Sequence, residues 1–181
     1  MATLRSKAAS DGQVTSAGAV NSTAATASVG DNKANQQAEA ILTFNTGSLP
    51  DYAIITGAQL MIKRQSQAGL PFSKLGSLAV DIKQPYFGSK LALEGTDFAD
   101  LADHDQIGTI SVPLNPVNGA WYSATLDPTL FNPLSAKMNT QLRLRFTGTA
   151  ADGIADYLKF YTGNSLTTSY RPKLIVTFMI P

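Results

Sequence analysis

The chain of 181 residues contains no cysteine, one histidine, one tryptophan and two glutamates. Without cysteine it has no disulfide, no thiolate nucleophile and no thiolate metal ligand. It also has no apolar run of ~18 residues, so no segment is expected to insert into a membrane. These absences leave few routes to an enzyme, and they favour a scaffold that presents a surface.

Charged residues are scarce as well. They make up 15% of the chain and give a net charge of +1, whereas ~25% is usual. The lysines and arginines are scattered, so no basic patch of the kind that binds nucleic acid is expected. The surface must then consist mostly of Ser, Thr, Asn, Gln and Gly, which suits sugars or other neutral protein faces better than polyanions.

What the chain does contain is the alternation of β-strands. From Glu39, the side chains of Ala40, Leu42 and Phe44 point to one face and those of Ile41 and Thr43 to the other, as a period of two requires. Similar runs recur between Gly, Pro, Asn and Asp residues. The predicted strands are 13–16, 27–30, 39–45, 55–64, 78–82, 107–112, 121–126, 141–146, 157–161 and 171–181.

Helical periodicity is almost absent. One short turn is predicted at Gly95–Leu101, where Thr96 or Asp97 can cap it, and a second at Pro128 behind Asp127. The sequence therefore predicts an all-β fold. We expect a single jelly-roll or Greek-key β-sandwich of about nine or ten strands, with one or two short helical turns.

The first part of the chain is dominated by Ala, Ser, Thr, Gly and Asn, with few aliphatic side chains to anchor a core. Residues 1–26 are accordingly expected to form a flexible arm or one that pairs with a partner. The β-sandwich domain is expected to span residues 27–181.

Catalytic chemistry finds little support. The one histidine, His104, lies in a polar loop between two aspartates, and no nucleophile motif accompanies it. We expect no enzyme.

A structural calcium ion fits the sequence better than a catalytic site, because calcium binds carboxylate, amide and carbonyl oxygens in loops. The candidate ligands of a structural calcium ion are Asp11, Asp31, Asp152 and Asp156.

A sugar site needs an exposed aromatic ring on which a pyranose can stack. Trp121 and Tyr122 are neighbours in a predicted strand, so one faces the core and the other the surface, and the large ring of Trp121 is the one expected inside. Tyr86 lies in a loop after a proline. Tyr86, Trp121 and Tyr122 are the candidate ligand-binding residues.

Several segments, spread over nearly the whole chain, together resemble the DNRLRE-type domains, jelly-roll modules similar to certain carbohydrate-binding modules. They are Asp11-Gly12, AILTFNTGSLP at 40–50, IITGAQLMI at 54–62, DYLKFYTGN at 156–164 and RPKLIVTF at 171–178. Asn45 stands where members of that family usually carry Asp. The resemblance implies a non-catalytic, extracellular or cell-surface module, and its motifs specify the scaffold rather than the ligand.

Two functions remain open at this point. In the first, the module binds polysaccharide or a cell-surface glycan. In the second, it is a self-assembling structural subunit of a surface fibre, layer or virus-like particle. Its N-terminal arm would then add a strand to a neighbouring copy.

Overall fold

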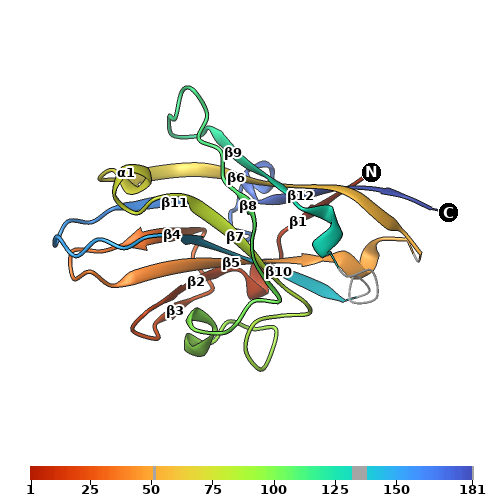
Figure 1. Ribbon diagram of the computed structural model, residues 1–181, viewed down its shortest axis with the longest axis horizontal. Helices are drawn as coiled ribbons and strands as arrows, with labels where there is room; N and C mark the ends of the chain where they lie inside the picture. The colour runs from red at the N-terminus through yellow and green to blue at the C-terminus, as the bar shows by residue number, and fades with distance from the viewer. Residues whose placement is uncertain (51, 132–137, 181) are drawn as a thin grey trace.

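A computed structural model describes residues 1–50, 52–131 and 138–180 of the chain. Within these residues the fold is a curled antiparallel sheet of twelve strands, and the only α-helix is one turn, α1 (Pro71–Lys74). Figure 1 shows most of the strands lying along the long axis of the molecule. No helix of the described ranges is long and apolar enough to cross a membrane.

The elements have the following bounds. The strands are β1 (Ala2–Arg5), β2 (Gly12–Thr15), β3 (Val20–Asn21), β4 (Thr26–Asp31), β5 (Gln37–Asn45), β6 (Ile54–Ala68), β7 (Leu78–Lys83), β8 (His104–Thr109), β9 (Trp121–Leu126), β10 (Asn139–Phe146), β11 (Tyr157–Tyr161) and β12 (Lys173–Met179). The described 3-10 turns are η1 (Ala8–Ser10), η2 (Thr46–Ser48), η3 (Gly95–Phe98), η4 (Pro128–Leu130) and η6 (Thr168–Tyr170).

The order of strands along the sheet is β1-β12-β6-β11-β4-β5-β10-β7-β8, and β9 pairs with β6. An isolated bridge joins Ser111, after β8, to Ser123 in β9, and the amide of Asp127 donates to the carbonyl of Ile107 at 2.8 Å. The sheet therefore curls until its last strand reaches β9, and it encloses a core.

The alternation of side chains builds that core. Leu42 in β5 lies opposite Leu142 in β10, and Leu60 in β6 lies opposite Leu174 in β12. Because side chains in a strand alternate between faces, these residues point inward together. The large apolar side chains that are fully buried in this main core include Leu42, Phe44, Leu60, Ile62, Leu78, Ile82, Tyr122 and Phe160.

A second, smaller cluster lies on the outer face of β5. Ile41 and Val14 pack there with Phe87 and Leu93, which belong to the segment 84–103 between β7 and β8. The amide of Phe87 donates to the side chain of Gln141 in β10 at 2.7 Å. This segment thus covers the outer face of β5 and β10.

The structure agrees with the predicted all-β class, and the strand count exceeds the nine or ten that were expected. β1 and β3 are the additional strands, four and two residues long. β6 continues to Ala68, beyond the predicted end at Arg64, and β8 starts at His104 rather than Ile107. Turns η3 and η4 lie where the sequence predicts helical turns; residue 181 of the predicted last strand lies outside the described residues.

The segment 1–26 contributes three short strands, β1, β2 and β3, to the chain's own sheet. β1 pairs with β12, and β2 pairs with β5. The carboxylate of Asp11 is fully buried and accepts hydrogen bonds from the amides of Thr43 at 2.8 Å and Gly163 at 2.9 Å. Backbone pairing, this one carboxylate and a few aliphatic side chains, the fully buried Val14 among them, position the segment.

Candidate functional site

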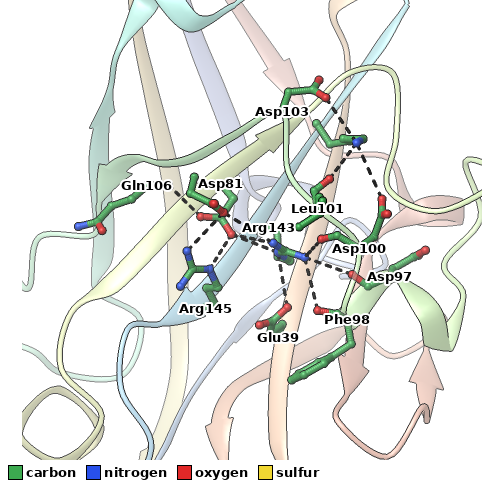
Figure 2. Close-up of polar contacts among 12 residues, drawn as sticks. Glu39, Asp81, Asp97, Phe98, Asp100, Leu101, Asp103, Gln106, Arg143 and Arg145 are labelled. Carbon is green, nitrogen blue, oxygen red and sulfur yellow. Dashed lines mark hydrogen bonds and ion pairs between the residues drawn. The ribbon is translucent and has the colours of Figure 1, made fainter.

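Charged and aromatic side chains gather at two places outside the main core. The first lies beneath the segment 84–103, around Arg143 of β10 (Figure 2). Its guanidinium bonds Asp81 through Nε at 3.2 Å and Nη2 at 3.0 Å, and Nη1 donates to the carbonyl of Asp100 at 2.7 Å. Its Cζ lies 4.6 Å from the centroid of the Phe87 ring. Arg143 therefore ties the covering segment to the sheet.

Asp81 in β7 is the hub of this network. Its carboxylate is fully buried and also accepts hydrogen bonds from Arg145 Nε at 2.7 Å and the Gln106 amide at 2.9 Å. The hydrogen bond to Asp81 raises the pKa of Arg145. Asp81 and Arg143 are thus satisfied by each other and by their neighbours, as buried charges must be.

Glu39 in β5 also belongs to this network, but its carboxylate has fewer hydrogen bonds than that of Asp81. Its carboxylate lies 3.5 Å from Arg143 Nε, and Oε2 is buried without a hydrogen-bond partner among the described residues. Burial raises the pKa of Glu39 to about 7. A raised pKa is often a sign of a catalytic group. Here, however, both Asp81 and Arg143 are buried, and their contacts hold the covering segment on the sheet.

The second place is the outer face of β6, β9 and β12, together with the end of β11. Lys63 of β6 lies opposite Trp121 of β9. Lys173 of β12 lies opposite Met61, which is two residues from Lys63 in β6 and therefore on the same face. Tyr170, from η6, covers Lys63. We call this set the aromatic–lysine surface: Lys63, Trp121, Tyr161, Tyr170 and Lys173.

The side chains of the aromatic–lysine surface touch one another in a chain. Lys63 Nζ lies 4.1 Å from the centroid of Tyr170, and Lys173 Nζ lies 4.4 Å from the centroid of Trp121. The rings of Tyr161 and Tyr170 are 4.9 Å apart with an interplanar angle of 50°. All five residues are partly exposed. Neither ammonium group forms an ion pair or hydrogen bond with any other described residue.

Of the three predicted ligand-binding residues, only Trp121 lies on this surface. The expectation for the pair Trp121 and Tyr122 is reversed. Tyr122 is fully buried and its hydroxyl accepts a hydrogen bond from Arg64 at 3.1 Å, so it offers no ring to a ligand. Tyr86 lies in the segment 84–103 and is partly buried there.

The sequence did not single out Lys63, Lys173 or Tyr170 as site residues. Lys63 and Trp121 are neighbours only because β6 and β9 pair in one register. Their faces could be inferred from the period of two. Their adjacency could not be, because a register is set by the packing of the whole sheet.

The four predicted calcium ligands lie in three places. Both oxygens of Asp11 accept backbone hydrogen bonds, and Asp152 lies 3.7 Å from Lys74 at the surface. Asp31 and Asp156 are neighbours: the Asp156 amide donates to Asp31 Oδ1 at 2.9 Å, and Oδ2 of each is buried without a described partner. Within the described ranges, no three acidic or imidazole groups come together as a metal site.

No protein-family model matches the chain, and no curated protein matches it.

Proposed function

We propose that the protein is a non-catalytic, extracellular β-sandwich module that binds an acidic polysaccharide or cell-surface glycan through the aromatic–lysine surface. The jelly-roll arrangement and the DNRLRE-type resemblance belong to this proposal. The curled antiparallel sheet with its enclosed core supports them.

The observation that carries the proposal is a pair of lysines that have no counter-ion among the described residues and lie among partly exposed rings. An aromatic ring binds the apolar face of a pyranose, and a lysine binds a carboxylate or sulfate on the same sugar. Each ammonium now lies over a ring, so a neutral sugar that stacks there loses a cation–π contact and gains no ionic one. An acidic sugar replaces the lost contact with an ion pair. The two lysines therefore favour an acidic ligand, in contrast to the neutral ligand that the composition of the whole chain favours.

The test is binding of polygalacturonate, hyaluronan and heparin, measured by calorimetry. Fully methyl-esterified polygalacturonate serves as the matched neutral polymer, because it keeps the backbone and loses the charge. We expect binding to at least one acidic polymer and weaker binding to the ester. Trp121→Ala should weaken binding about tenfold, the value of one good stacking contact.

Tyr52→Asn is the matched control. It removes an exposed ring that lies outside the aromatic–lysine surface, and asparagine tolerates the positive φ of 65° at this position. Tyr52→Asn should bind as the unaltered protein does. No binding to any of the three polymers would overturn the proposal, and so would equal binding of polygalacturonate and its ester.

The second candidate, self-assembly by strand addition, rests on β1. This strand of four residues lies at the edge of the sheet, and among the described strands it pairs only with β12. A short terminal strand is the kind that copies can exchange. The exchangeable part is then residues 1–5, because Asp11 and Val14 are fully buried in their own chain. Deleting residues 1–5 should convert an assembled protein to monomers in light scattering, and a monomeric full chain would contradict this candidate.

The proposal of a structural calcium ion now concerns Asp31 and Asp156, whose buried Oδ2 atoms have no described partner. Calcium should raise the unfolding temperature relative to EGTA, and Asp156→Asn should remove the increase. Equal unfolding temperatures with calcium and EGTA would contradict it.

A further inference from the structure

A polar groove of about 220 Å³ lies next to β11, beside the strands β2 and β4. β2 and β4 both pair with β5 at Ala38, through Thr15 and Gly30. Gln13 links β2 to β4, because its Oε1 accepts a hydrogen bond from the Ser28 amide at 2.8 Å. The lining residues are Gln13, Thr15, Ser28, Gly30, Asp31, Asn32, Gln36, Ala38 and Tyr157.

The groove carries polar groups that the protein itself does not use. Within the described part of the chain, the NH2 groups of Gln13 and Gln36 and the hydroxyls of Ser28 and Tyr157 have no hydrogen-bond partner. Asp31 also lines the groove, and its negative charge disfavours an anion there. Amide and hydroxyl groups beside an aromatic ring fit a hydroxylated, uncharged ligand group.

β11 joins the groove to the aromatic–lysine surface, because Tyr157 lines the groove and Tyr161 belongs to that surface. Tyr157, Lys159 and Tyr161 alternate with the buried Leu158 and Phe160, so they share the outer face. Tyr157 and Tyr161 are thus about 13 Å apart along β11. Trp121 lies about 10 Å from Tyr161 across the sheet, because β6 stands between β11 and β9 and the distance is two strand spacings. Lys159 Nζ lies 6.0 Å from the Tyr157 ring and continues the row of cations.

We propose that the groove is a second subsite of the same glycan chain, one that binds the hydroxyl groups of a sugar unit several units away from the unit stacked on Trp121. The inference rests on the proposed function. It adds that the protein recognises the interior of a long chain, whose acidic groups meet the lysines and whose hydroxyl groups meet the groove.

The experiment compares oligosaccharides of four and eight sugar units from whichever of polygalacturonate, hyaluronan and heparin binds most tightly. In the unaltered protein the dissociation constant should fall about tenfold from the four-unit to the eight-unit oligosaccharide, because only the longer one reaches both subsites. Tyr157→Ala should remove this gain and leave the affinity for the four-unit oligosaccharide unchanged. Trp121→Ala should weaken binding of both.

Gln36→Ala keeps the test independent of folding, because Gln36 is exposed. It should remove part of the length-dependent gain, whereas Tyr52→Asn should leave the whole gain in place. Tight binding of the eight-unit oligosaccharide that is unaffected by Tyr157→Ala and Gln36→Ala would overturn the groove and leave the proposed function standing. Failure of both oligosaccharides and all three polymers to bind would overturn the proposed function itself.

Discussion

Two cations lie over aromatic rings in different regions of this sheet, and they differ in what else they touch. Arg143 lies over Phe87, and its nitrogens are bonded to Asp81 and to backbone carbonyls. Lys63 lies over Tyr170, with the centroid of the Trp121 ring at 5.5 Å, and its ammonium has no hydrogen-bond or ion-pair partner among the described residues. The first cation belongs to a filled, buried network and the second to an open surface.

The comparison shows that a cation–π contact does not by itself identify a site. A guanidinium offers five donors, and around Arg143 the fold supplies acceptors and excludes water. An ammonium on a partly exposed face keeps its donors available for a ligand. The experiments below test whether the two regions differ in this way, starting with the largest expected effect.

Arg143→Ala should cost the most. It leaves the fully buried Asp81 with one fewer cation and releases the segment 84–103. Removing one partner of a buried ion pair costs about 3–5 kcal/mol. Urea unfolding should show a loss of this size. Arg143→Lys keeps the charge but loses the planar set of donors. Its loss of stability should therefore lie between zero and that of Arg143→Ala. A loss under about 1 kcal/mol for Arg143→Ala would show that the network does not hold the segment.

Glu39→Gln should change the pH dependence of stability. The pKa of Glu39 is raised from 4.5 to about 7 in the folded protein, so its proton stabilises the fold below pH 4.5. That contribution is lost as the pH rises from 4.5 through 7. The variant should equal the unaltered protein at pH 4 and exceed it at pH 8, by on the order of 1–3 kcal/mol.

The pKa of Asp11 is also raised, from 3.8 to about 7, so the unaltered protein loses stability from a second group over an overlapping window of pH. Asp11 is present in both proteins, and its contribution cancels in their difference. Urea unfolding at pH 4, 6 and 8 measures that difference. A variant that is less stable than the unaltered protein at pH 8 would mean that the ion pair with Arg143 outweighs the cost of burying the Glu39 carboxylate.

The sequence predicts features that depend on local patterns and misses those that depend on contacts between distant strands. The strands of the core follow from alternation, as in Ala40, Leu42 and Phe44, because that signal is local. β1 was missed, since ATLR is short and its pairing with β12 joins the two ends of the chain. The networks around Arg143 and Lys63 were missed because both depend on residues brought together from distant strands.

The reversed expectation for Trp121 and Tyr122 has a different cause. Tyr122, Ala124 and Leu126 form one face of β9, and Trp121, Ser123 and Thr125 form the other. The first face is the more apolar, so the alternation itself places Tyr122 inside. Residue size suggested the opposite, and the pattern of the strand is the better guide, because one face of a half-buried strand turns inward as a unit.

Lys173→Gln should weaken binding of the acidic polymer by a few fold and should reduce its salt dependence. An exposed ion pair contributes about 0.2–1 kcal/mol and is screened by salt. Calorimetry at low and high salt measures both effects. Lys74→Gln is the control, because Lys74 pairs with Asp152 instead of lying on the surface proposed for binding. Equal effects of the two substitutions would point to general charge attraction rather than to a site.

Lys63→Gln should have the smallest effect on folding, and it is the counterpart of Arg143→Ala. Both substitutions remove a cation from above a ring, but Lys63 is partly exposed and bonds no described acceptor. A cation–π contact at an exposed site contributes only about 0.5–1 kcal/mol. The free energy of unfolding in urea should therefore change by less than this amount, while binding of the acidic polymer weakens as for Lys173→Gln. A loss of stability as large as that of Arg143→Ala would make Lys63 a structural cation, and the difference between the two regions would disappear.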